Sequence, residues 1–123
     1  MQRAFQRDDL LVILDGIDDG VVKLDGQANF VAMNQVAANV YRRAGFDPQT
    51  MLGRSTWELF PELKETFVER ELRQVLEDHV QVAYEFYYPK DQHWYETKGY
   101  PASPGAILVF RDIRANKTVP PSS

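Results

Sequence analysis

Apolar and polar residues follow two different periods along this chain, and each period predicts one kind of element. The first apolar stretch, residues 3–17, has the spacing of an amphipathic helix. Two short apolar runs follow at residues 21–24 and 30–33. The pair Asp25-Gly26 between them is a turn signal, because glycine adopts positive φ and aspartate bonds its own backbone. The pattern therefore predicts an N-terminal helix followed by a β-hairpin.

A helical period returns in the middle of the chain. Apolar residues recur every three or four positions from 36 to 44, and Gly45 ends this predicted helix. Asp47 and Ser55 each stand where an N-cap would begin a short helix. Residues 63–79 have an apolar stripe opposite a ladder of charged residues, which predicts a long helix.

The last third of the chain alternates residue by residue, as strands do. Residues 80–88 place apolar and aromatic side chains on one side, and a turn at 89–92 leads into a second strand at 93–100. A third predicted strand covers residues 106–113. Helices grouped between two sets of consecutive strands predict an α+β fold with an antiparallel sheet.

The size and composition fit one domain with one hydrophobic core. The chain has 123 residues, of which 44% are hydrophobic and 26% are charged, as is typical of a soluble globular domain. A formal net charge of -4 argues against a nucleic-acid partner, because phosphates need a basic surface. No window is apolar enough for a spanning helix, and residues 1–9 are too charged for a signal peptide. We therefore expect a cytoplasmic protein without a membrane partner.

Several local motifs occur in a characteristic order between Leu10 and Arg114. They are Asp19-Gly20-Val21, Asn34, Gly53-Arg54, Phe60-Pro61-Glu62, His93-Trp94 and Phe110-Arg111-Asp112-Ile113-Arg114. In this order they resemble a PAS domain, the sensory module of histidine kinases and transcription regulators. The resemblance implies a five-stranded antiparallel sheet in the order 2-1-5-4-3, with the helices on one face around a pocket. The expected division is an N-terminal helix at 1–18, a PAS core at 19–114 and a flexible tail at 115–123.

The end of the last predicted strand is where the resemblance places the signal output. Asp112, Ile113 and Arg114 follow Phe110 there, and Arg114 replaces the threonine that most members of the family carry. Asp112 is expected to bond a turn backbone or a nearby Arg or Lys, and so to fix the angle at which the chain leaves the sheet. The expected partner is an effector domain or a signalling protein, such as a histidine kinase of a two-component system.

Aromatic and apolar side chains fall on the segments that surround the pocket of the family. The ligand-pocket candidates are Asn34, Tyr41, Trp57, Phe60, Phe67, Leu72, Tyr84, Phe86 and Phe110. Two interpretations stay open, a filled aromatic core and a cavity for an unidentified small ligand. In the second interpretation, Asn34 and Tyr41 supply the polar groups.

The residues available argue against the cofactors that some PAS relatives carry. Haem-binding relatives have an axial histidine near the start of the long helix, where this chain has Thr66, Phe67 and Val68. The chain has no cysteine, so it cannot form a covalent flavin adduct. The two histidines, His79 and His93, have no further His or acid at metal-ligand spacing. We expect no cofactor and no metal.

No catalytic residues are predicted. A catalytic site needs a nucleophile with its base, a phosphate-binding loop or a poised carboxylate pair, and the chain has none of these motifs. The sequence therefore favours a non-catalytic sensory or regulatory domain that binds a small ligand or mediates protein association. The alternative is a small-molecule carrier or a hydrolytic enzyme built on a similar α+β cup.

The predicted N-terminal helix indicates a homodimer. Its apolar stripe, which includes Leu10 and Leu14, can cover the sheet of its own chain, whereas Leu11 and Val12 point elsewhere and would stay exposed in a monomer. Two-fold pairing is the commonest closed symmetry, so the same helix of two chains would meet. The expected dimer interface therefore consists of Leu10, Leu11, Val12 and Leu14.

Overall fold

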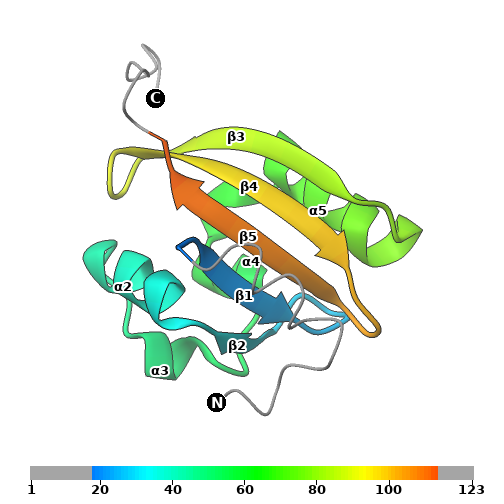
Figure 1. Cartoon of the computed structure of the whole chain (residues 1–123), viewed down its shortest axis with the longest axis horizontal. Helices are drawn as coiled ribbons and strands as arrows, with labels where there is room; N and C mark the ends of the chain where they lie inside the picture. Colours follow the sequence, from blue (N-terminus) through cyan, green and yellow to red (C-terminus); the bar gives the residue numbers. More distant parts are fainter. Residues whose placement is uncertain (1–17, 114–123) are drawn as a thin grey trace.

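A five-stranded antiparallel sheet forms the centre of the computed structural model, which describes residues 18–113 (Figure 1). Its strands are β1 (Gly20–Leu24), β2 (Phe30–Met33), β3 (Val82–Tyr88), β4 (His93–Pro101) and β5 (Ala106–Asp112). They lie side by side in the order β2-β1-β5-β4-β3, as the resemblance implied. The predicted N-terminal helix and the predicted tail lie outside the described residues.

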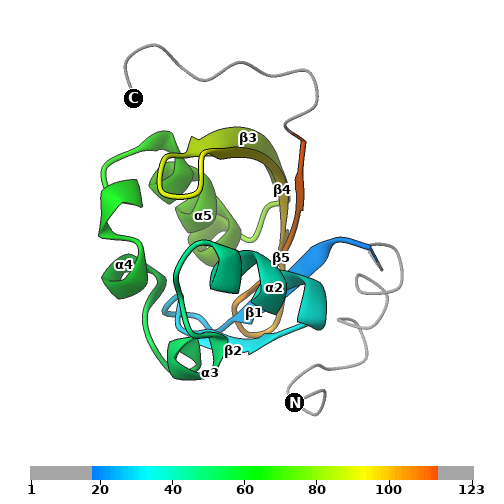
Figure 2. The ribbon, with the colours of Figure 1, turned by 90° about the vertical axis from the view of Figure 1, so that its left-hand side faces the viewer.

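The helices lie between β2 and β3 in the chain and cover one face of the sheet (Figure 2). They are α2 (Gln35–Arg43), α3 (Pro48–Met51), α4 (Thr56–Leu59), the 3-10 helix η2 (Pro61–Leu63) and α5 (Phe67–Asp78). Asp47 and Ser55 cap α3 and α4, as predicted, because their side-chain oxygens accept hydrogen bonds from backbone N–H groups of the first turn. The helices therefore form one layer over the inner face of the sheet.

The long helix is shorter than the predicted range of 63–79. Pro61 begins a separate 3-10 turn, and α5 begins only at Phe67. There the Thr66 hydroxyl accepts a hydrogen bond at 3.2 Å from the backbone N–H two residues on, as an N-cap does. His79, with φ 59°, ends the helix in the left-handed conformation. The capping hydroxyl therefore sets the true start of the helix.

One carboxylate holds the turn between β1 and β2. Asp25 Oδ1 accepts from the backbone N–H groups of Gln27 and Asn29, each at 2.9 Å, and Oδ2 accepts from Asn29 Nδ2 at 3.1 Å. Burial acts to raise the pKa of Asp25, but the three hydrogen bonds together outweigh it and lower the pKa. The turn predicted at Asp25-Gly26 is confirmed.

The main core lies between the inner face of the sheet and the helices. Leu24, Phe30, Met51, Leu72 and Phe110 belong to it, and none of them is more than 8% exposed. Alternate residues of the strands point to the opposite face, where a second, smaller cluster forms. That outer cluster consists of Val21, Ala32, Ile107 and Val109.

The start of β1 lies directly against Phe110 of β5. Gly20 and Phe110 are register partners, and a Cβ added at Gly20 would lie 2.6 Å from Phe110 Cζ. Side chains do not approach so closely, so glycine is required unless the ring moves. The backbone of β1 therefore limits where the Phe110 ring can lie on the inner face.

Candidate functional site

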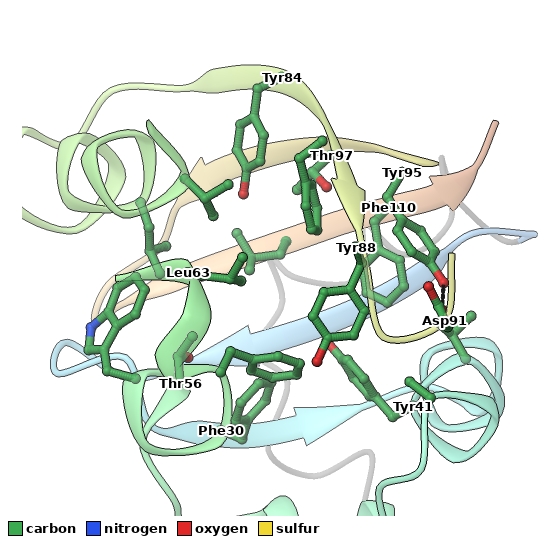
Figure 3. Close-up of a pocket in the computed structure, with 18 residues that line it drawn as sticks. Phe30, Tyr41, Thr56, Leu63, Tyr84, Tyr88, Asp91, Tyr95, Thr97 and Phe110 are labelled. Atoms are coloured by element: carbon green, nitrogen blue, oxygen red, sulfur yellow. Dashed lines mark hydrogen bonds between the residues drawn. The ribbon is translucent and has the colours of Figure 1, made fainter. Parts of the chain in front are cut away.

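A pocket of about 90 Å³, partly open to solvent, lies between the inner face of the sheet and the helices (Figure 3). Its wall consists of Phe30, Val40, Tyr41, Ala44, Thr56, Trp57, Phe60, Leu63, Val68, Leu72, Tyr84, Phe86, Tyr88, Asp91, Tyr95, Thr97, Leu108 and Phe110. The predicted candidates that line it are Tyr41, Trp57, Phe60, Leu72, Tyr84, Phe86 and Phe110. The aromatic residues thus surround a cavity.

Aromatic rings pack at tilted and edge-to-face angles around the pocket. Tyr41 lies against Phe30, Phe60 and Phe110, with ring centroids 5.8–6.0 Å apart. Phe60 also packs on Tyr88, with centroids 5.8 Å apart. Such pairs stabilise the fold by about 0.5–1.5 kcal/mol each beyond the burial of their area. The wall therefore offers ring faces and edges to a flat apolar molecule.

The tyrosines of the wall keep their protons. Burial raises the pKa of Tyr41, and the nearby Tyr84 and Tyr95 add to the effect. Burial also raises the pKa of Tyr84, with Glu71 as a further cause and a hydrogen bond with Thr97 acting in the opposite direction. These phenol groups are therefore uncharged at neutral pH.

Tyr88 carries a buried polar atom that has no partner. Within residues 18–113, its hydroxyl is the buried side-chain oxygen or nitrogen without a hydrogen bond, and the residue is 4% exposed. Tyr88 points from β3 into the pocket, on the side of Phe30 and Tyr41 (Figure 3). Burial, then the neighbouring Glu62 carboxylate, raises the pKa of Tyr88, yet that carboxylate makes no hydrogen bond of normal geometry with the hydroxyl. A neutral donor therefore faces the cavity.

Asp91 lies in the turn between β3 and β4, with its side chain 2% exposed at one end of the pocket. The Tyr95 hydroxyl donates to one carboxylate oxygen (Figure 3), and the His93 backbone N–H donates to the other at 3.2 Å. Arg43 Nη2 lies 3.9 Å from the same carboxylate. The buried charge is therefore both hydrogen-bonded and paired, as a buried carboxylate must be.

Arg43, at the C-terminal end of α2, connects Asp91 to the end of β5. Arg43 Nη2 donates to Tyr95 Oη at 2.9 Å and lies 3.5 Å from Asp112 Oδ2. His93 Nδ1 also hydrogen-bonds to Asp112 Oδ2. Burial acts to lower the pKa of Arg43, but Tyr95 and the two carboxylates outweigh it and raise the pKa. We name these residues, Arg43, Asp91, His93, Tyr95 and Asp112, the exit network.

The sequence indicated only part of the exit network. Asp112 was expected to bond a turn backbone or a nearby Arg or Lys, and in the structure it pairs with Arg43. Asp91 and His93 were not predicted as members, because the length of the β4–β5 hairpin separates each of them from Asp112 in the chain. The strand order could have indicated them, since it places the start of β4 beside the end of β5, where Tyr95 and Asp112 are register partners.

The residues expected at the signal exit and at the dimer interface are described only in part. The backbone N–H of Ile113 donates to the carbonyl of Trp94 at 3.0 Å, which continues the pairing of β5 with β4 beyond Asp112. Outside the described residues lie Arg114, Leu10, Leu11, Val12 and Leu14.

Two predicted pocket residues, Asn34 and Phe67, are not among the residues that line the pocket. Asn34 is the N-cap of α2, and its Oδ1 accepts from Ala37 N at 2.9 Å and from Val21 N at 3.0 Å. Its side chain therefore joins β1 to α2. Phe67 begins α5, is 39% exposed and packs edge-on against Tyr84.

Within residues 18–113, no group of three or more acidic or histidine side chains could hold a metal ion. Over the same range, no helix has the length and apolar character needed to cross a membrane.

The topology, the helices on one face and the pocket between them agree with a known family. The family model of the PAS fold matches residues 14–118. The chain belongs to the PAS family. A comparison with curated proteins gave no match for this PAS domain.

Solved structures share the fold at low sequence identity. A sensory box sensor histidine kinase from Vibrio cholerae is 19% identical, with a TM-score of 0.63 over 87% of this chain and 90% of that chain. A domain of an HTR-like protein from Haloarcula marismortui is 21% identical, with a TM-score of 0.61 over 77% of this chain and 97% of that chain. Vibrio cholerae VqmA bound to DPO is 19% identical, with a TM-score of 0.59 over 87% of this chain and 58% of that chain. At these identities the likeness concerns the fold alone.

Proposed function

We propose that this PAS domain is a non-catalytic sensor that binds a small molecule in its aromatic pocket and transmits occupancy to an effector through the end of β5. The observation that carries the proposal is the hydrogen-bonded connection from the pocket wall to Asp112. Asp91 and Tyr95 belong to the wall, and Arg43 connects both of them to Asp112. His93 supplies a second link from β4 to Asp112.

The exit network can transmit a change because two carboxylates share one guanidinium. Arg43 Nη2 lies 3.9 Å from Asp91 and 3.5 Å from Asp112, so neither contact is at its optimum. A molecule that pushes on the Tyr95 ring also moves Asp91, because the Tyr95 hydroxyl is bonded to that carboxylate. Arg43 then binds one carboxylate more closely and the other less. Since Asp112 is the last residue of β5, the distance between Arg43 and Asp112 then sets the direction in which the chain leaves the sheet.

The receiver of the signal, in this proposal, is an effector domain or a separate signalling protein. Support comes from the family and from its sensor histidine kinase relative. We also propose that the domain acts as a homodimer in the cytoplasm, without nucleic acid or a membrane as partner. The net charge of -4 supports the absence of a nucleic-acid partner.

One alternative function, a hydrolytic enzyme, receives less support from the pocket wall. Asp91 is the carboxylate of that wall, and it already accepts hydrogen bonds from Tyr95 and from the His93 backbone. A base is therefore not available to activate the hydroxyl of Thr56 or Thr97.

Binding of toluene, followed by protein-detected NMR, tests whether the pocket takes an aromatic molecule. Val68 lines the pocket and is 6% exposed, whereas Val80 lies outside it and is 44% exposed. Val68→Phe fills the cavity, and Val80→Phe adds the same atoms at the surface. We expect saturable shifts of pocket residues in the wild type and in Val80→Phe, and at least tenfold weaker binding in Val68→Phe.

Two results would contradict the proposed pocket function. One is a wild-type chain that shows no saturable binding of toluene. The other is a folded Val68→Phe variant that binds as tightly as Val80→Phe. Ala44→Leu is a milder filling change at another wall residue, and it replaces Val68→Phe if the larger ring prevents folding.

A further inference from the structure

The unpartnered hydroxyl of Tyr88 is the feature of the pocket that identifies a ligand chemistry. A buried hydroxyl without a hydrogen bond is uncommon in folded proteins, because leaving it unpaired destabilises the fold. Tyr88 is 4% exposed, belongs to the pocket wall and has no partner within residues 18–113. Its phenol keeps its proton, since burial and the nearby Glu62 carboxylate both raise the pKa of Tyr88. The Tyr88 hydroxyl is therefore a hydrogen-bond donor without an acceptor among the described residues.

Four other hydroxyls of the wall, those of Thr56, Tyr84, Tyr95 and Thr97, are already engaged. Thr56 Oγ1 donates to the carbonyl of Ala28 at 2.7 Å. The Tyr95 hydroxyl donates to Asp91, and Tyr84 shares a hydrogen bond with Thr97. Of the two remaining wall hydroxyls, those of Tyr41 and Tyr88, that of Tyr88 is the fully buried one without a hydrogen bond within residues 18–113. It can therefore donate to a bound molecule without giving up a hydrogen bond.

The charges of the wall exclude an ionised ligand. No Lys or Arg belongs to the residues that line the pocket, so an anion would be buried there without a cation. Asp91 is the one acidic residue of the wall, and it would repel an anion. A cation would find Asp91 already paired with Arg43 and hydrogen-bonded by Tyr95. An uncharged ligand avoids all of these costs.

The size and the ring contacts of the cavity define the shape. A cavity of about 150 Å³ lined by Leu, Ile and Phe binds benzene. The present pocket has about 90 Å³, which is smaller, and it is partly open to solvent. It therefore has room for no more than one ring, part of which would extend toward the opening. The rings of Phe30, Tyr41, Phe60 and Phe110 surround this space and favour an aromatic occupant.

We propose that the pocket selects an uncharged, single-ring aromatic molecule with a hydrogen-bond acceptor that binds the Tyr88 hydroxyl. This assignment rests on the proposed function and names the ligand class for the same pocket. Phosphates, carboxylates and sugars are excluded by it. A neutral ring nitrogen, a carbonyl or an ether oxygen meets the requirement, provided that it lies on one side of the ring.

Toluene and 4-methylpyridine form the matched pair of probes. They have the same shape, and 4-methylpyridine replaces one ring CH by a nitrogen that is unprotonated in mildly alkaline buffer. Dissociation constants for both probes are measured by NMR titration of the wild type, Tyr88→Phe and Glu62→Gln. Comparing each probe between variants, rather than the two probes with each other, removes their difference in hydrophobicity.

We expect Tyr88→Phe to weaken the binding of 4-methylpyridine but not that of toluene. Tyr88→Phe weakens the binding of 4-methylpyridine about tenfold, which is the value of one hydrogen bond, and changes that of toluene by less than about twofold. Glu62→Gln, the control for the neighbouring carboxylate, leaves both dissociation constants within about twofold. Equal effects of Tyr88→Phe on the two probes overturn the assignment. So does a selective loss of 4-methylpyridine binding in Glu62→Gln.

The two proposals fail in different ways. If toluene binds the wild type and Val68→Phe blocks it, the pocket function stands, and the absence of selectivity in Tyr88→Phe then rejects only the ligand class. If neither probe binds the wild type, both proposals are rejected.

Discussion

Removal of the Tyr88 hydroxyl is expected to stabilise the empty domain. Tyr88 is 4% exposed, and its Oη has no hydrogen-bond partner among the residues that the structure describes. A buried hydroxyl without a partner costs about 1–3 kcal/mol. Tyr88→Phe keeps the ring that packs on Phe60 and removes this cost. We expect the free energy of unfolding to rise by about 1 kcal/mol and the melting temperature to rise by about 4 °C.

Tyr95→Phe is the matched control, and the opposite sign is expected for it. Tyr95 is also 4% exposed, but its hydroxyl accepts from Arg43 at 2.9 Å and donates to Asp91. Loss of this hydroxyl removes its hydrogen bonds with Arg43 and Asp91. The Asp91 carboxylate, which is 2% exposed, then has one hydrogen-bond donor fewer. The expected loss of unfolding free energy is about 2–3 kcal/mol, or about 8–12 °C in melting temperature.

Urea titration and thermal unfolding, both followed by far-UV circular dichroism, measure the two effects. Native mass spectrometry must first show that each sample is free of ligand, because a bound molecule stabilises the folded state. If Tyr88→Phe lowers the stability as much as Tyr95→Phe does, the Tyr88 hydroxyl is hydrogen-bonded in solution. That result would refute both the reasoning here and the ligand class inferred from it.

Three further predictions concern the exit of the chain, a turn and the dimer. Asp112→Asn removes a charge that pairs with Arg43, and the Asp112 side chain is 24% exposed. We therefore expect the melting temperature to fall by less than about 5 °C and the output of the full-length protein to change. A large loss of stability with unchanged output would make Asp112 a purely structural residue. The folded-state pKa of Asp25 lies below the ordinary value of 3.8, so its contribution to stability is present above that value and is lost as the pH falls through the lowered pKa. In urea titrations Asp25→Asn should therefore be less stable than the wild type at neutral pH and approach it at about pH 3, and a difference that does not depend on pH argues against a role of the charge. Light scattering at tens of micromolar should give a dimer mass for the wild type and a monomer mass for Leu11→Glu, whereas a monomer mass for both contradicts the predicted dimer.

Local signals in the sequence were sufficient for most of the elements. The turn at Asp25-Gly26 and the caps at Asp47 and Ser55 depend on hydrogen bonds between near neighbours, which a local motif already contains. The start of α5 was missed because the apolar stripe continues past the true boundary, which the Thr66 cap sets. Helix ends therefore followed hydrogen-bonding side chains more closely than hydrophobicity.

The functional site needed tertiary information. Most pocket aromatics were predicted, since they lie on segments that the fold brings together. Asn34 was assigned to the pocket because it is polar and near the expected wall, yet its amide is used to join β1 and α2. The exit network joins Arg43 to Asp112, and the free hydroxyl of Tyr88 is visible only when every neighbour is known. No local pattern contains such information.

The close contact between Gly20 and the Phe110 ring has a mechanical consequence. The ring is part of the pocket wall, and it fills the place where a side chain at Gly20 would lie. A ligand that displaces this ring pushes on the first residue of β1 and on β5 at once, because the two residues are register partners. Neighbouring strands are about 4.8 Å apart, so the polypeptide enters and leaves this part of the fold through adjacent points. Segments attached to β1 and to β5 would then change direction together, because the two strands are paired at this point.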